Sequence, residues 1–156
     1  MKNIALWVLL LTLAAASVLA AQDKLVAPTN PDELVVFVNQ AAAFANLEGK
    51  DAALVVFNDK NGKFTVGDVY VFAYNFDGMC LAHALRPERV GTNTLADKDV
   101  NGVPFIKNLL ETARDKGQGF DEYSYVNPNN GQLAQKTSYV IKIDDTWWIG
   151  AGIYKK

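Results

Sequence analysis

The residue whose chemistry stands out in this sequence is its only histidine, His83. It follows an Asp77-Gly78 turn within the segment Gly67 to Leu85, and the residues before that turn include a row of aromatic side chains. A neutral imidazole among apolar residues on a strand needs a hydrogen-bond partner or a ligand. Two interpretations therefore stay open: a structural histidine satisfied by a neighbour, and a ligand contact.

The sequence lacks the patterns of known catalytic sites. It has no nucleophile elbow, no phosphate-binding glycine loop and no second histidine, so we predict that the protein is not an enzyme. Asp59 to Gly62 resembles the start of a calcium loop, but the later ligand positions are missing, and we interpret this segment as a turn. A single cysteine, Cys80, excludes an internal disulfide and a Cys/His metal site. We predict no metal and no cofactor.

The N-terminal segment resembles a secretory signal peptide. Lys2 precedes an uncharged run from Ile4 to Ala21, which has a leucine-rich centre and ends in small residues. We predict that residues 1–21 are cleaved and that the remaining chain is periplasmic or secreted. The competing interpretation is an uncleaved membrane anchor, because the run has the minimum length for crossing a bilayer.

The remaining chain is weakly acidic and has the size of one domain. Without Lys2 it has 14 basic and 17 acidic residues, and no run of like charges, so nucleic acid is not an expected partner. Its length of about 135 residues suits a single domain. We place this domain at residues 32–156, after a polar linker over residues 22–31.

The periodicity of apolar residues predicts an α+β fold. Apolar residues at three- and four-residue steps predict a helix that begins with Asp32 as its cap, runs to about Leu47 and stops at Gly49. Further helices are expected over residues 51–57 and 104–116. Strands are expected over residues 67–74, 79–85, 120–126, 135–143 and 147–154, and short turns between neighbours favour an antiparallel sheet.

Alternation within the first two strands predicts which side chains share a face. Tyr70, Phe72 and Tyr74 fall on one face of the first strand, with Val69, Val71 and Ala73 on the other. Because both faces are largely apolar, we expect this strand to be central. In the second strand, Leu81, His83 and Leu85 are expected to share a face.

Several of these segments together carry a family resemblance. Gly67-Asp68-x-Tyr70-x-Phe72-x-Tyr74-x-x-Asp77-Gly78-x-x-Leu81-Ala82-His83, followed by Val90-Gly91, resembles the signature of single Cache domains of type 2 (sCache_2). Later pieces follow in the family's order: Gly102 with Phe105, Gly117-x-Gly119, Tyr123 to Pro128, Lys136-x-x-Tyr139-Val140, and Trp148 to Tyr154. The resemblance covers residues 32–154.

The resemblance implies an extracytoplasmic sensor with a PAS-like fold. A long N-terminal helix would pack on a five-stranded antiparallel sheet with a crossing helix, and a pocket on the sheet would hold a small metabolite, often an organic acid. Members usually sit between transmembrane helices in chemoreceptors or sensor kinases. Here the sequence stops at Lys156, directly after the last strand, so we expect signalling through a separate receptor or kinase.

A pocket for a small acid needs a cation or several hydrogen-bond donors, because a buried carboxylate is costly unless it is paired. The family pattern puts Lys136 beside the ligand, on a strand that also carries Tyr139. The tyrosine hydroxyls of Tyr123 and Tyr125 could donate hydrogen bonds, and Tyr74 could line the wall. For each the alternative is ordinary packing or, for Lys136, exposure to solvent. Together with His83, these residues are the predicted ligand-binding site. Arg86 is a weaker candidate, with a surface position favoured.

Three hypotheses follow from the sequence. The first is an extracytoplasmic sensor domain that binds a small molecule, such as a carboxylate, and acts through a separate signalling partner. The second is an interaction module that keeps the fold but has no ligand and forms a homodimer through its N-terminal helix. The third, a small hydrolase, would need a site that the sequence does not reveal.

Overall fold

The computed structural model describes residues 25–155, so the predicted signal peptide lies outside the described residues. This part of the chain forms three α-helices, a short 3-10 helix and seven strands. The helices are α1 (Pro31–Glu48), α2 (Lys50–Phe57) and α3 (Phe105–Lys116), and the 3-10 helix is η1 (Pro87–Arg89). The strands are β1 (Thr65–Val66), β2 (Val69–Tyr70), β3 (Phe72–Asn75), β4 (Cys80–His83), β5 (Gln118–Val126), β6 (Leu133–Lys142) and β7 (Trp147–Tyr154).

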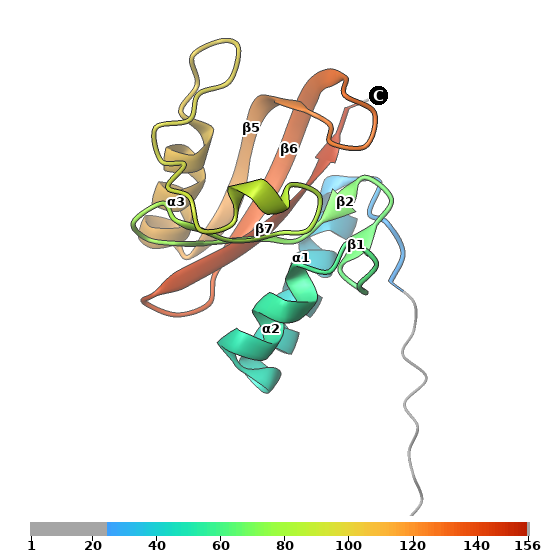
Figure 1. Ribbon diagram of the computed structural model, residues 1–156, viewed down its shortest axis with the longest axis vertical. Coiled ribbons are helices and arrows are strands. Elements are labelled where there is room, and N and C mark those ends of the chain that lie inside the picture. Colours follow the sequence, from blue (N-terminus) through green and yellow to red (C-terminus); the bar gives the residue numbers. More distant parts are fainter. Residues whose placement is uncertain (1–24, 156) are drawn as a thin grey trace, which may run out of the picture.

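The strands β3 to β7 form one antiparallel sheet in the order β4-β3-β7-β6-β5, and β1 pairs with β2 separately. The helices α1 and α2 lie on one side of this sheet and α3 on the other (Figure 1). This arrangement confirms the predicted α+β fold with a five-stranded antiparallel sheet. The strand β7 is in the middle of the sheet, and β3 lies between β4 and β7 with both faces covered. Because β3 is not an edge strand, the prediction of a central first strand is confirmed for this part of the segment.

The helix α1 begins two residues earlier than a cap at Asp32 predicts, and Asn30 is its cap. The Asn30 side chain accepts a hydrogen bond from the backbone amide of Glu33 at 3.0 Å. The Glu33 carboxylate in turn accepts one from the backbone amide of Thr29 at 2.8 Å. Asp32 lies within the first turn, where its negative charge interacts favourably with the helix dipole. The predicted cap at Asp32 was thus wrong by two residues, because Asn30 reaches the free amides.

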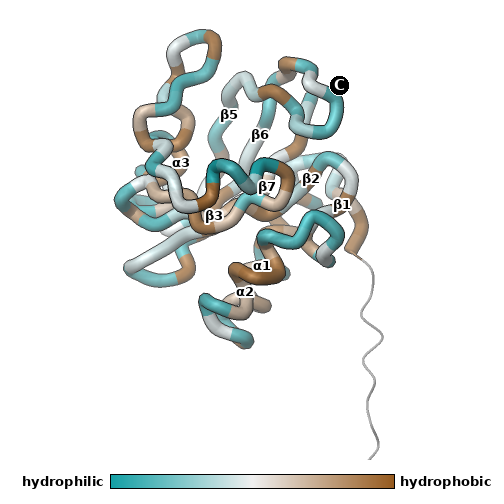
Figure 2. Tube along the Cα trace, viewed as in Figure 1, coloured by the Kyte–Doolittle hydropathy of each residue, from teal (hydrophilic) through white to brown (hydrophobic). Residues whose placement is uncertain are grey.

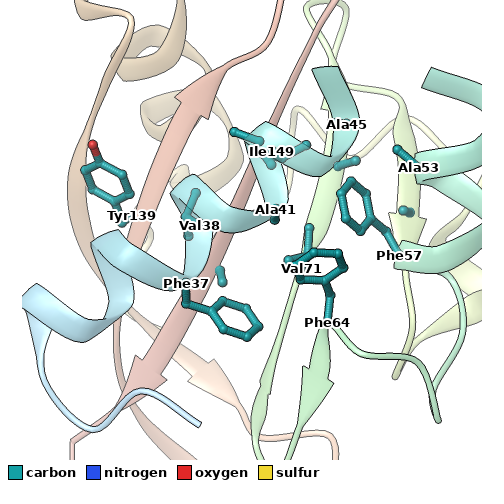
Figure 3. Packing of buried hydrophobic residues seen from close by; sticks show 14 of the residues in the cluster. Phe37, Val38, Ala41, Ala45, Ala53, Phe57, Phe64, Val71, Tyr139 and Ile149 are labelled. Atoms are coloured by element: carbon teal, nitrogen blue, oxygen red, sulfur yellow. The ribbon is translucent and has the colours of Figure 1, made fainter. Parts of the chain in front are cut away.

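The larger hydrophobic core lies between the sheet and the helices α1 and α2 (Figure 3). Phe57 and Phe64 pack edge to face, with ring centroids 5.3 Å apart. Val71 and Ile149 reach this core from the sheet. Full burial of each such large side chain contributes roughly 1.5–3 kcal/mol to folding. This face of the sheet is therefore filled by apolar packing.

The second core lies between the other face of the sheet and α3. Leu109 and Leu110 of α3 pack against the row Tyr70, Phe72 and Tyr74, which confirms that the row shares a face. In Figure 2 the segment of β3 beneath this region is coloured as hydrophobic, whereas many outer loops are hydrophilic. This second core also contains the buried polar side chains of His83 and Lys136.

A bulge in the hairpin of β3 and β4 interrupts the alternation of side chains between the two faces of β4. Ala73 pairs with Ala82, but Tyr74 pairs with Cys80, so Leu81 is the extra residue. Leu81 therefore packs against the core under α1, while His83 lies on the α3 side. The expectation that Leu81 and His83 share a face was wrong, because simple alternation does not hold across a bulge.

None of the helices within residues 25–155 combines the length and the apolar character that crossing a membrane requires.

Candidate functional site

The candidate site is a small cavity between the α3 side of the sheet and the beginning of α3. It is lined by residues from β2, β3, β4, β5, β6 and α3, namely Tyr70, Phe72, Tyr74, His83, Phe105, Ile106, Tyr123, Tyr125 and Lys136. The volume of the cavity that the centre of a water molecule can occupy is about 10 Å³. This volume has room for about one water. Aromatic rings therefore enclose most of a site that has one cation.

Lys136 is the main polar group of this cavity. It is 1% exposed, and its Nζ donates a hydrogen bond to the Tyr70 hydroxyl at 3.1 Å. The ammonium lies 4.4 Å from the ring centroid of Tyr70 and 5.1 Å from that of Tyr125. It forms none of the salt bridges found within residues 25–155. Burial, with a smaller contribution from the charge of Arg86, lowers the pKa of Lys136 to about 7.

Glycine in the neighbouring strand makes room for the lysine. Gly152 of β7 pairs with Ser138, and a Cβ atom at Gly152 would overlap the Lys136 side chain and the Ser138 hydroxyl. The lysine side chain can therefore lie flat on the sheet and reach the cavity only because this position has no side chain.

His83 enters the cavity from β4. Its ring centroid lies 4.6 Å from that of Tyr70, and its Nδ1 is buried without a hydrogen-bond partner among the described residues. The backbone of His83 is held from the other layer, because its amide donates to the Asn58 side chain at 3.1 Å. Burial is the largest cause that lowers the pKa of His83 to about 2, and the charge of Lys136 adds to it. The imidazole is thus neutral and has a free nitrogen.

Two tyrosines from β5 form the wall opposite the sheet's β4 edge. Tyr123 stacks on Phe105 with centroids 4.7 Å apart, and its hydroxyl shares a hydrogen bond with Ser138 at 2.9 Å. The ring of Tyr125 stands nearly perpendicular to that of Tyr123. Burial raises the pKa of both hydroxyls, so both remain protonated donors at neutral pH.

Tyr74 lines the same cavity and also belongs to the core. Its ring stacks on Trp148 with centroids 5.1 Å apart, and it is 2% exposed. The structure thus brings five of the predicted residues to one cavity: Tyr74, His83, Tyr123, Tyr125 and Lys136.

Tyr139 lies away from this cavity, on the opposite face of the sheet. It belongs to the core under α1, as Figure 3 shows, and its ring packs on Phe120 at 4.8 Å. The reason is the two-residue period of a strand, which sends side chains at an odd separation to opposite faces. Tyr139 is three residues from Lys136, so we withdraw it as a pocket residue.

Two arginines after β4 add positive charge near the cavity. The Arg86 guanidinium lies 5.3 Å from the ring centroid of Tyr125 and donates to the Val126 carbonyl at 3.2 Å. Arg89 is bound to Asp97 at 2.8 Å. The Nε of each is buried without a hydrogen-bond partner in the described part of the chain. Arg86 is therefore partly inward-facing and not the surface residue that the sequence favoured.

Sequence reasoning did not select three residues that shape the cavity. Tyr70 carries the hydroxyl that contacts Lys136, and alternation with Tyr74 was the available signal. Phe105 reaches the site because it starts α3. Asn58 follows α2 and bonds the carbonyl of Leu81 as well as the amide of His83, a long-range contact that no local pattern indicates.

A larger groove lies elsewhere, between the segment 27–31 and the ends of β5, β6 and β7. It has about 800 Å³ of space and is open to solvent. The charged pair on its wall, Glu122 and Lys155, is already joined at 3.0 Å. Because a buried group without a partner indicates a ligand better than size does, we assign the site to the cavity of Lys136.

The sequence model of the family described as Single Cache domain 2 matches residues 37–156. The chain belongs to this family. A curated relative, the sensor histidine kinase MctS of Rhizobium johnstonii, is 36% identical over 88 residues. That match spans 56% of this chain but 19% of the kinase, so this Cache chain corresponds to about a fifth of its relative.

Solved structures confirm the Cache fold. A methyl-accepting chemotaxis protein from Vibrio parahaemolyticus superposes with a TM-score of 0.66 at 27% identity, covering 79% of this chain and 86% of that one. A Cache chemosensory domain studied for carboxylic acid recognition has a TM-score of 0.69 at 19% identity, covering 80% and 92%. At that identity the second likeness shows the fold alone.

Proposed function

We propose that this Cache domain is an extracytoplasmic sensor that binds a small organic acid in the cavity of Lys136. The observation that carries the proposal is a fully buried lysine whose hydrogen-bond partner is a neutral hydroxyl. A buried charge is stable only when it is paired or hydrogen-bonded. A ligand carboxylate would supply the missing negative charge, and the free Nδ1 of His83 and the neighbouring tyrosine hydroxyls would supply hydrogen bonds.

The comparisons support the proposal from two directions. The chemosensory domain of the same fold was studied for carboxylic acid recognition, which makes a carboxylate the first ligand class to test. The curated relative is a sensor histidine kinase, and another structure of this fold is a periplasmic sensor domain of a chemotaxis protein. We therefore propose that the bound acid changes the interaction of this domain with a separate kinase or receptor, on the outer side of the membrane after cleavage of residues 1–21.

The size of the cavity limits the ligand. With room for about one water, it admits an acid of a few heavy atoms only if a wall moves outward. The wall formed by Tyr125 is the one that can yield, because Tyr125 is the least buried of the four tyrosines that line the cavity. Formate, acetate and propionate are therefore the graded series to compare.

Isothermal titration calorimetry of the purified protein with these three acids, at pH 6, tests the proposal. Acetamide and propionamide serve as neutral probes of matched shape. We expect binding of at least one acid and of neither amide. We also expect Lys136→Met to weaken that binding by about 10- to 150-fold, because a hydrogen bond to a charged group is worth roughly 1.5–3 kcal/mol. Lys60→Met, which removes an exposed lysine, is the matched control.

The second candidate is an interaction module without a ligand, and the small free volume of the cavity favours it. The same titration separates the two functions. If neither the three acids nor a wider panel of amines and amino acids binds to the folded protein, the sensor proposal fails. A concentration-dependent homodimer in analytical ultracentrifugation would then support the module.

A further inference from the structure

The Lys136 cavity has a second chemical property that binding of an acid does not use. An amine is a nucleophile only when it is neutral. Exposed lysines have a pKa near 10.4, so at pH 7 roughly one in 2,500 is neutral. Because burial brings the pKa of Lys136 to about 7, about half of its amines are neutral at that pH, which is roughly a thousandfold more.

The surroundings of this amine select a small and uncharged reagent. Lys136 is 1% exposed and is ringed by the aromatic side chains of Tyr70, Phe72, Tyr125 and Tyr154, whose centroids lie 4.4–5.5 Å from Nζ. The free space nearby accommodates about one water. A charged electrophile would have to lose its hydration and a bulky one would have to displace several of these rings, whereas a three-atom apolar molecule has little hydration to lose and needs only the outward movement of Tyr125 that a small acid also needs.

We propose that the Lys136 amine reacts reversibly with carbon dioxide and forms a carbamate inside this cavity. The nitrogen lone pair forms the new C–N bond, one π bond of carbon dioxide breaks, and its electron pair stays on an oxygen. The nitrogen loses one proton to solvent. The amine, carbon dioxide and the released proton thus balance, and no other reagent is required.

The product would find partners that the free lysine does not have. A carbamate is an anion, and the His83 imidazole in the tautomer with a proton on Nδ1 can donate to it from a nitrogen that now has no partner. The Tyr70 hydroxyl, already 3.1 Å from Nζ, is a second donor. The positive charge of Arg86 acts on this position, since it contributes to the lowered pKa of Lys136. The cavity therefore changes from a cationic to an anionic state around groups suited to an anion.

Solution ¹³C NMR of protein labelled with ¹⁵N at the lysine ε-nitrogens tests this inference directly. In ¹³C-bicarbonate at pH 7.5, where carbon dioxide is in equilibrium, we expect one carbamate signal with a ¹³C–¹⁵N coupling, which the unlabelled N-terminal amine cannot produce. The signal should persist in Lys60→Met and disappear in Lys136→Met. It should also disappear when the wild type is unfolded in urea, which keeps the test decisive if the Lys136 variant does not fold.

A coupled signal that is absent from the folded wild type, or that survives in Lys136→Met or in urea, would overturn the proposal. The inference does not depend on acid binding. Binding of an acid without a carbamate signal would leave the proposed function standing alone, and a carbamate signal without binding of formate, acetate, propionate or the wider panel would leave only this inference. If both occur, saturating propionate should reduce the carbamate signal at least tenfold, because the two anions compete for one cavity.

Discussion

Lys136 gives the folded protein an unusual dependence of stability on pH. Its pKa is about 7 in the folded state and near 10.4 in an unfolded chain. Between these values the unfolded state binds more protons, so the free energy of unfolding contributed by this group rises with pH from about 7 to about 10. The stabilisation is complete only above the unfolded pKa and is lost as the pH falls toward 7.

Replacing Lys136 with Met should remove this dependence. We expect the variant to be as stable as the wild type at pH 6, or up to about 4 kcal/mol more stable, because replacing a buried charge with an apolar side chain is often stabilising. Urea denaturation at pH 6, 7, 8 and 9 measures the effect. Lys60→Met should keep the wild-type slope above pH 7, and parallel curves for Lys136→Met and wild type would contradict the expectation.

His83 should act in a separate and more acidic range. Its pKa is about 2 in the folded protein and near 6.5 when unfolded, so its stabilising contribution is present above pH 6.5 and is lost as the pH falls toward 2. Between pH 6 and 5 the wild type should lose about 1 kcal/mol from this group. His83→Gln should show a flatter thermal-unfolding midpoint over that range, and an unchanged slope would show that His83 titrates normally.

The contrast between Lys136 and Tyr139 shows what the sequence predicts at the residue scale. The period of two in a strand was sufficient to separate them, since their separation is odd. It was also sufficient to gather Tyr70 and Tyr74 on one face. What the sequence could not predict is that Lys136 lacks an acidic partner, because that depends on every element that meets at the cavity.

At the scale of the elements, β7 has a special part in the site. Gly150 and Gly152 face the cavity side, and a Cβ atom at Gly150 would lie 2.8 Å from the ring of Phe72. The residue between them, Ala151, packs in the core under α1. Residues of β7 thus alternate between glycines, which must lack a side chain on the cavity face, and a residue that packs in the core on the other face. The closing Gly-Ala-Gly segment was visible in the sequence, but its reason appears only when β6 and β3 are placed beside it.

Gly152→Ala should displace the Lys136 side chain. We expect at least tenfold weaker acid binding, together with a loss of roughly 1–3 kcal/mol of stability from overpacking. Calorimetry and urea denaturation of the same sample measure both quantities. Ala151→Gly is the matched control, because it lowers stability from the other face of the same strand and should leave the acid affinity unchanged. Equal affinities for Gly152→Ala and wild type would contradict the assigned path of the lysine.

The segment between β4 and α3 shows where element prediction stops. The sequence predicted an irregular stretch over residues 86–102 from its turn-forming residues, and between β4 and α3 the structure has only the short helix η1. Its path is set by distant contacts: Cys80 and Thr92 pair through their backbones, and the Asp99 carboxylate accepts a hydrogen bond from the amide of Ser124 at 2.9 Å. The segment is therefore tied to both edges of the sheet by polar contacts that have no periodic signature.

At the scale of the whole molecule, the sheet separates two kinds of core. The side under α1 and α2 is filled by apolar packing, whereas the side under α3 holds Lys136 and His83 among aromatic rings. Apolar periodicity predicted this layered fold well, because each layer needs a continuous apolar face. Apolar periodicity did not predict the bulge at Leu81 or the cap at Asn30, since both depend on local hydrogen bonding more than on hydropathy.

The polar side chains buried under α3 lead to a prediction for ligand binding. One group in the cavity should titrate between pH 6 and 9. Burial raises the pKa of Tyr70, Tyr125 and Tyr154, and it lowers that of His83 to about 2. Lys136 has a pKa of about 7. Of Lys136 and these four described groups, it is therefore the one that changes charge between pH 6 and 9.

Acid affinity should therefore be nearly constant below pH 7 and fall by about tenfold per pH unit above it, since the carboxylate binds the protonated lysine and binding must then take up a proton. Calorimetry with acetate or propionate at pH 6, 7, 8 and 9 measures the affinity. Repeating the pH 8 titration in phosphate and in Tris, which differ in ionisation enthalpy, measures the proton uptake, which should approach one per ligand. A constant affinity with no proton uptake would mean that the ligand does not pair with Lys136, even if it binds in the same cavity.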